Sequence, residues 1–263
     1  TIFRKPLAGP YVLGLSAGAS LGVALLVMGF GSFLVWDGGN WFSTLSIVLA
    51  AWLGSGLVLF LVMVVSAYLT NLLSILILGI LFGSAISAIV NLLQYFSSEM
   101  MLKSFVVWTM GSLGSTSMAQ LYWFFALVFI GFIISFAVAR SLNVMLLGEN
   151  YARSMGVNIK KTRMLTFLST SILAGTVTAF CGPIGFIGIV IPHVSRMVFK
   201  TANHFVLIPS CILIGSGIML VADLISHLSF DGFILPINTV TSLTGIPIII
   251  WIIIRNRQLD NAL

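Results

Sequence analysis

The segment LGENYARSMGVNIKKTR, residues 147–163, separates two long apolar regions of the sequence. It carries four basic residues and one acidic residue. Residues 38–98 earlier in the chain and residues 164–195 after it contain no Asp, Glu, Lys or Arg. Uncharged stretches of this length have room for helices of about 20 residues, which is enough to cross a lipid bilayer. The pattern therefore predicts membrane helices on both sides of one exposed polar segment.

The composition indicates the same class of protein. Hydrophobic residues make up 59% of the 263 residues and charged residues only 7%, whereas a soluble globular domain has about 25% charged residues. The apolar runs are continuous, and the strands of a membrane β-barrel would instead alternate in polarity over about 10 residues. We therefore expect an all-α polytopic membrane protein. The net charge of +6 is typical of basic residues kept on the inner side of a membrane, and it does not indicate nucleic-acid binding.

The distribution of basic residues predicts the topology. Eleven of the twelve Lys and Arg residues fall into four groups, which are Arg4 with Lys5, those within 140–163, Arg196 with Lys200, and Arg255 with Arg257. The positive-inside rule places all four groups in the cytoplasm, so an even number of crossings must separate them. Lys103, Asp37 and Glu99 then lie in outward loops, and both ends of this segment lie in the cytoplasm.

These intervals have room for eight transmembrane helices. We expect them at about 12–34, 42–66, 74–95, 120–141, in two arms of about 16 residues within 164–195, and at 206–227 and 236–254. Gly182 and Pro183 mark the break between the two arms. The second arm, GFIGIVIPHVSR, is expected to be short or broken because about 16 residues span only about 24 Å as an α-helix.

Two residues of the polar segment are four positions apart. Glu149 and Arg153 would share one face of a short helix between Gly148 and Gly156. One interpretation is a solvated surface pair, and the other is a contact with a partner protein. The position between two membrane helices favours the contact.

Few other residues could carry chemistry. Asp223 and His227 lie near the outward end of a predicted helix, where a local bond is favoured over a proton or ion site. His193, His204, Cys181 and Cys211 lack the spacing of metal ligands or of a disulfide framework. We expect no catalytic residue and no metal site, and no phosphate-binding GxxxxGK[ST] motif is present. If transport needs ATP, another subunit must hydrolyse it.

Three glycines repeat at every fourth position in the first predicted helix, at Gly14, Gly18 and Gly22. Small residues at this spacing let two helices approach closely in a membrane. We interpret them as packing residues.

Five blocks in order resemble one family. The blocks are RKPLAGPYVLGLSAGASLG, WTMGSLGS, LGENYARSMGV, GPIGFIGIVIPHVSR and LPINTVTSLTGIPIIIWII, and together they are similar to FecCD-type permease subunits of ABC importers for iron-siderophores, haem or cobalamin. The resemblance implies a ten-helix type II importer permease. The eight helices would be its third to tenth, with about two more before Thr1, in a single permease domain over 1–263.

The resemblance also implies roles for particular residues. Residues 147–163 would be a cytoplasmic coupling loop whose two short helices contact the ATPase, through Gly148, Glu149, Ala152, Arg153 and Gly156. A cytoplasmic gate would include Pro6, Leu7, Thr70, Asn71 and Ser74. The translocation path would be lined from the helix similar to 75–95, through Leu76, Gly79, Gly83 and Ser87.

The implied partners are those of an importer in the bacterial inner membrane. They are a second permease copy or close paralogue, two cytoplasmic ATPase subunits that hold ATP and Mg, a periplasmic or lipoprotein substrate-binding protein, and membrane lipid. No cofactor is expected on this chain. Lys103 is the only outward basic residue, whereas the family usually offers several to its binding protein.

Two other classes of function remain as alternatives. An ion-coupled secondary transporter or channel without an ATPase would need paired acids or a cluster of Asn, Ser and Thr residues at the membrane midplane, and only Asp223 is charged near a membrane interior. A membrane-embedded enzyme would need a nucleophile and base or a metal set. The motifs do not distinguish the ligands, although iron-siderophores are the family's most common substrates.

Overall fold

The computed structural model describes residues 14–29, 41–66, 72–114, 116–228 and 235–260. Within these residues the regular structure is entirely helical. The chain divides into two compact units, Thr1–Pro183 and Ile184–Leu263, which we describe separately. Among the described residues, four helical stretches are long and apolar enough to cross a membrane, at Ile77–Phe96, Met118–Met145, Ile159–Cys181 and His204–His227. Shorter apolar helices lie at Ser16–Gly29, Ser46–Val62, Ile187–Phe199 and Ile237–Ile250.

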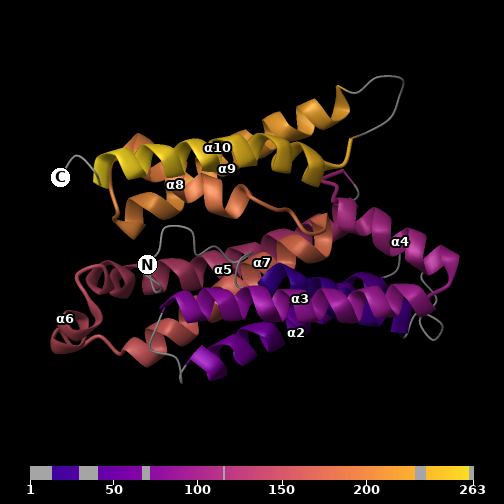
Figure 1. The fold of residues 1–263 in the computed structure, drawn as a ribbon, viewed down its shortest axis with the longest axis horizontal. Helices are drawn as coiled ribbons and strands as arrows, with labels where there is room; N and C mark the ends of the chain where they lie inside the picture. Colours follow the sequence, from indigo (N-terminus) through magenta and orange to yellow (C-terminus); the bar gives the residue numbers. More distant parts are fainter. Residues whose placement is uncertain (1–13, 30–40, 67–71, 115, 229–234, 261–263) are drawn as a thin grey trace. The chain divides into compact units, whose positions relative to one another are not determined.

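The helices of the first unit follow the predicted order (Figure 1). They are α1 (Leu15–Ala24), the π-helix η1 (Leu25–Gly29), α2 (Trp41–Ser66), α3 (Leu72–Phe96), α4 (Glu99–Met110), α5 (Met118–Met145), α6 (Glu149–Ser154) and α7 (Ile159–Cys181). The predictions at 42–66, 74–95 and 120–141 are confirmed within a few residues. For the predicted helix 12–34, the described part from 15 to 29 is helical, and the rest lies outside the described residues.

The prediction of two equal arms within 164–195 is wrong. Helix α7 begins at Ile159, inside the basic segment, and is 23 residues long. The cause is a cap, because the side chain of Asn158 accepts a hydrogen bond from the backbone N–H of Lys161 at 3.0 Å. The helix ends before Gly182, which has a φ of +76° that favours glycine. The break at Gly182 and Pro183 is therefore confirmed, although the first arm is much longer than expected.

Helix α4 occupies the connection that was predicted only as a long outward loop. Its Phe105 is 2% exposed and packs in a core with residues of α1, α2 and α3, which are Ala24, Val58, Val62, Ile86 and Val90. Trp108 donates from Nε1 to the carbonyl oxygen of Ala179 at 3.4 Å. The backbone N–H of Ser112 donates to the carbonyl of Cys181 at 3.0 Å. The end of α4 is thus attached to the end of α7.

Glycines form the contact between α1 and α2. A Cβ atom built on Gly18 would lie 2.6 Å from the carbonyl oxygen of Gly54. A Cβ on Gly22 would overlap the carbonyl of Ala50. The backbones therefore approach more closely than larger residues would allow, and the prediction of close helix packing from these glycines is confirmed.

Hydrogen bonds link α7 to both α2 and α5. Trp52 of α2 donates from Nε1 to Thr176 Oγ1 at 3.2 Å, and the hydroxyls of Ser55 and Ser171 lie 3.1 Å apart. On the α5 side, the hydroxyl of Ser169 donates to the carbonyl of Gly131 at 2.9 Å. We refer to these contacts together as the α7 seam.

The second unit contains α8 (Ile187–Phe199), α9 (His204–His227) and α10 (Ile237–Asp260). Helix α8 is 13 residues long with Pro192 inside it, which confirms the prediction of a short helix. The backbone N–H of Gly185 donates to the side-chain oxygen of Asn238 at 3.1 Å. A Cβ on Gly245 of α10 would lie 2.8 Å from the Cβ of Phe186. The start of α8 is thus held against α10.

Candidate functional site

The polar segment folds into a compact turn between α5 and α7. We refer to residues 146–163 as the elbow. It contains the six-residue helix α6, and Gly148 and Gly156 flank this helix with φ angles of +124° and +81°. Backbone angles of this kind are rarely adopted by other residues, so the two glycines set where α6 begins and ends.

The resemblance predicted two short helices here, and the structure has one. Helix α6 ends at Ser154, and the second expected short helix is the first turn of the long helix α7. Thr162 supports this start, because its hydroxyl donates to the carbonyl of Asn158 at 2.9 Å. The basic residues from 160 to 163 therefore belong to a helix that continues into an apolar span.

A small apolar cluster holds α6 against the neighbouring helices. Met145 of α5, Ala152 of α6 and Ile159 of α7 are 3%, 0% and 8% exposed and pack together. The backbone N–H of Val157 donates to the carbonyl of Ala152 at 3.0 Å. Ala152 was predicted as part of the coupling site, and the structure places it on the inner side of α6, where it is fully buried.

Glu149 forms an ion pair with Arg163, although the spacing pointed to Arg153. Arg163 donates from Nη2 to Glu149 Oε1, and the two side chains are 43% and 37% exposed. The Nε atom of Arg163 is buried and has no hydrogen-bond partner. Glu149 and Arg153 do share the short helix α6, as predicted. Arg163 was missed because it lies fourteen positions from Glu149, beyond any helical spacing rule.

The outer side of the elbow is exposed and mixes apolar and basic groups. Leu147, Tyr151 and Met155 are 69%, 54% and 58% exposed, and Arg153 is exposed between them. Aromatic residues, Met and Arg are enriched at protein interfaces. The chemistry of this surface suits a protein partner better than a small ligand.

The residues predicted to line a path differ in how exposed they are on α3. Gly79 is buried, and its carbonyl would lie 3.4 Å from a Cβ on Gly14 of α1. Gly83 has open space where a Cβ would lie. Ser87 is exposed, and its hydroxyl donates to the carbonyl of Gly83 at 2.9 Å.

Ser74 and Leu76 lie on α3, but their side chains are outside the described part. The predicted gate residues Pro6, Leu7, Thr70 and Asn71 also lie outside the described residues.

Two polar residues on the same side of α3 as Ser87 were not predicted. Ser84 and Asn91 are exposed, and the positions 84, 87 and 91 fall on one helical face. An amide exposed on an apolar span is costly in lipid. The spacing of these three polar residues in an otherwise apolar stretch was the signal that could have identified them.

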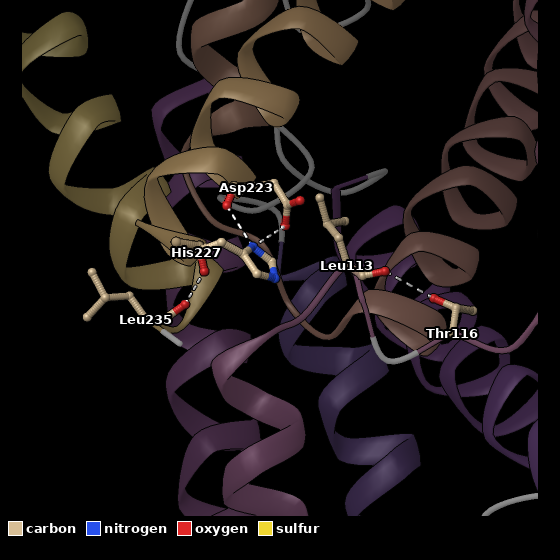
Figure 2. A network of polar contacts seen from close by, with 6 residues as sticks. Leu113, Thr116, Asp223, His227 and Leu235 are labelled. Atoms are coloured by element: carbon tan, nitrogen blue, oxygen red, sulfur yellow. Dashed lines mark hydrogen bonds and ion pairs between the residues drawn. The ribbon is translucent and has the colours of Figure 1, made fainter. Parts of the chain in front are cut away.

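Asp223 and His227 make a local contact at the end of α9. Figure 2 shows the imidazole of His227 turned back along the helix towards Asp223. Its Nδ1 donates to the carbonyl oxygen of Asp223 at 2.9 Å and lies 3.7 Å from Oδ1 of the carboxylate. The adjacent Ser226 hydroxyl donates to the carbonyl of Leu235, which ties the chain before α10 to α9. The predicted intramolecular bond is confirmed.

The described residues bring no metal-ligand set together. No three side chains of His, Cys, Asp or Glu gather among them, and Cys181 and Cys211 are free thiols. The expectation that this chain binds no metal and no cofactor stays a prediction.

The comparisons with known proteins agree with this architecture. The family model of the FecCD transport family matches residues 1–255. The hemin transport system permease protein HmuU of Yersinia pestis is 34% identical in an alignment of 271 positions, gaps included, that covers 98% of this chain and 75% of that protein. The vitamin B12 import system permease protein BtuC of Klebsiella pneumoniae is 33% identical over 97% of this chain and 74% of its own length.

A solved structure also shares the fold. It is described as a metal-chelate type ABC transporter in an inward-facing conformation, and it matches with a TM-score of 0.81 and 32% sequence identity. The match covers 97% of this chain and 78% of the other chain.

The helices of the described residues, with apolar spans and an exposed elbow between two of them, are those of a polytopic membrane protein. The chain belongs to the FecCD transport family. It is a permease subunit of an ABC importer and a multi-pass protein of the bacterial inner membrane. Importers of this class work with ATPase subunits and binding proteins.

Proposed function

We propose that this permease moves an iron chelate, haem or cobalamin across the inner membrane by alternating access. Two copies of the chain would form a homodimer, with two ATPase subunits on the cytoplasmic side and a substrate-binding protein on the other. ATP and Mg would be bound by the ATPase, and this chain would carry no catalytic residue. Both termini of the segment would lie on the cytoplasmic side with the elbow.

The observation that carries this proposal is the construction of the elbow. Helix α6 lies between α5 and α7, both long enough to cross a membrane, and it is held from inside by Ala152. Its outer residues Tyr151, Arg153 and Met155 remain exposed. A short helix fixed at the membrane surface with an apolar and basic outer face is suited to receive force from a partner protein.

The exposed polar residues of α3 support a path along this helix. Ser84, Ser87 and Asn91 would face a hydrated space in the dimer, because lipid would leave the amide of Asn91 without partners. Gly83, which has open space beside it, would widen the path at the same level. Small uncharged residues let a bulky ligand pass without binding it tightly.

The substrate class comes from the relatives. HmuU is named for hemin, BtuC for vitamin B12 and the solved neighbour for metal chelates. Each of these is a metal held in an organic ligand, which fits a wide path without charged groups. We therefore propose a metal chelate of this size, with iron-siderophores included.

The ion-coupled alternative has less support. The acid that it would need is Asp223, and its neighbour His227 bonds to its backbone at the exposed end of α9. A proton or ion site would instead place acids together inside the spans.

The first test is co-purification of the permease in detergent with its cognate ATPase subunit. We expect a stable complex with the wild type. Arg153→Glu should lower the affinity about tenfold or more, because an exposed cation of the contact becomes an anion. Arg140→Glu is the matched control, since Arg140 is exposed on α5 but lies before the elbow.

Two results would contradict the proposal. Equal binding by Arg153→Glu and the wild type would remove α6 from the contact. A wild-type permease that binds no ATPase, yet transports in liposomes under an ion gradient, would favour the secondary transporter.

A further inference from the structure

We propose that Arg163 is a positioning residue of the coupling site, which through its ion pair with Glu149 fixes α6 to α7 so that both helices move as one body. The inference rests on the proposed function of the elbow. It adds a residue and a mechanism that neither the family motif nor the helical spacing supplies.

The first step is that α6 needs more than one attachment. Between α6 and α7 lies a turn of four residues, 155–158, and it contains Gly156 with a φ of +81°. The backbone N–H of Val157 bonds to the carbonyl of Ala152 and closes the α6 end of this turn, and side-chain contacts add attachments between α6 and α7. The apolar contact of Ala152 with Ile159 and Met145 holds one point of α6. The ion pair of Glu149 with Arg163 holds a second point at its first residue.

The second step concerns which charges remain for a partner. The carboxylate of Glu149 accepts from Arg163, so it is already used inside the chain. Arg153, one helical turn later, is exposed. The two charged residues of the α6 motif therefore have different tasks, because Glu149 orients the helix and Arg153 is presented to the partner.

The third step is the route from α6 into the membrane. Arg163 lies on the first turns of α7, and the seam contacts at Ser169 and Thr176 lie further along the same helix. From Arg163 to Thr176 an α-helix extends about 20 Å at its usual rise per residue. A displacement of α6 would therefore reach α2 and α5 through hydrogen-bonded helix contacts. Without the ion pair, part of that displacement would be lost in the turn.

The fourth step separates positioning from folding. Ion pairs between partly exposed groups stabilise a fold little, and both members of this pair are more than a third exposed. Loss of the pair should therefore leave the permease folded while α6 samples a wider range of orientations. Arg163 contacts Glu149 only through Nη2, and its buried Nε has no partner. A lysine at this position could keep the charge pair and would not bury an unpaired Nε.

The experiment measures the orientation of α6 directly. Spin labels are placed at Asn150→Cys on α6 and Leu168→Cys on α7, both exposed positions, in the full chain with Cys181→Ala and Cys211→Ser. Pulsed EPR then gives the distribution of the label distance in nanodiscs, with and without the ATPase. The variants are Arg163→Gln, Arg163→Lys, the exchange Glu149→Arg with Arg163→Glu, and Arg140→Gln as the control for charge loss.

We expect a single narrow distribution of the label distance in the unmodified elbow and in Arg140→Gln. Arg163→Gln should broaden this distance distribution and bind the ATPase roughly fivefold more weakly, at the low end of usual coupling between sites. Arg163→Lys and the charge exchange should restore both readouts. A merely structural defect would not be restored by exchanging the two charges.

The inference is overturned if Arg163→Gln keeps the narrow distance, or if neither Arg163→Lys nor the charge exchange restores it. The distance measurement does not require the ATPase, so it tests the ion pair even if the partner is wrong. A narrow distance in a wild-type permease that binds no ATPase would overturn the proposed function and, with it, the coupling role of Arg163.

Discussion

Helix α2 packs on its two neighbours in two different ways. Towards α1 it presents Gly54, whose backbone nearly touches that of Gly18. Towards α7 it presents Ser55 and Trp52, which make hydrogen bonds to Ser171 and Thr176. Gly54 and Ser55 are adjacent in sequence and lie about 100° apart around a helix with 3.6 residues per turn.

The difference shows two solutions to the same physical problem. Lipid is as apolar as the side chains, so the hydrophobic effect does not drive helices together in a membrane, and close packing or interhelical hydrogen bonds must do so. The glycine contact has no free space, so any added atom must push the backbones apart. The α7 seam is more tolerant, because Ser and Thr hydroxyls can turn to their own helix. Thr166 and Thr170 already do this, with bonds of 2.8 Å to the carbonyls four residues back.

The largest expected effect is at the glycine contact. Gly54→Ala should lower the free energy of unfolding by about 1–3 kcal/mol, because the new methyl group overlaps the carbonyl of Gly18. Gly56→Ala on the same helix has open space around the added Cβ. It should be neutral or stabilising by at most about 1 kcal/mol.

Reversible unfolding by SDS titration in mixed micelles measures both variants. The comparison between the two sides of α2 fails if Gly54→Ala and Gly56→Ala shift the unfolding curve equally.

A smaller effect is expected in the seam at Trp52. Trp52→Phe removes the donor to Thr176, whose side chain is fully buried, and should cost about 1–2 kcal/mol. The indole also covers Gly175, where an added Cβ would lie 2.5 Å from Trp52 Cδ1, so the smaller ring leaves some space. A double-mutant cycle with Thr176→Val isolates the hydrogen bond. Strictly additive effects of the two substitutions would show that the bond contributes nothing.

The smallest effect is expected at Ser55. Ser55→Ala removes the contact with the hydroxyl of Ser171, and Ser171 can turn to a carbonyl of its own helix. The cost should be about 0.6 kcal/mol, the average for hydrogen bonds between membrane helices. Ser104→Ala on α4 is the control, because that hydroxyl bonds to Met100 of its own helix. A loss at Ser55 as large as that of Gly54→Ala would mean that the seam is as intolerant as the glycine contact.

Helix positions were largely predictable because they depend on local sequence. Runs of apolar residues identified α2, α3, α5 and α9 within a few residues. The start of α5 even has its own signal, since the Ser117 hydroxyl accepts from the N–H of Gln120 and the Gln120 side chain accepts from the N–H of Ser117. The early start of α7 has a weaker signal, because a run of basic residues favours a loop, although Asn158 can cap a helix that begins among them.

The candidate site was predictable only in part. The polar segment, its two glycines and the residues of α6 were identified from the sequence, and the structure places them in one elbow. The partner of Glu149 was not, because Arg163 comes close only after the chain turns at Gly156. The exposure of the predicted path residues was also not predictable, because Gly79 packs on α1 whereas Ser87 stays exposed. The eight crossings and the single domain over 1–263 stay predictions.

The class of protein, the order of the helices and the position of the elbow can be predicted from the amino-acid sequence alone. These follow from hydrophobicity and charge, which each residue carries wherever it lies. Helix packing determines which side of α3 is exposed, which glycines contact a neighbouring backbone and which cation pairs with Glu149. These depend on distances between segments that are far apart in the chain, and such distances are set only when the helices pack.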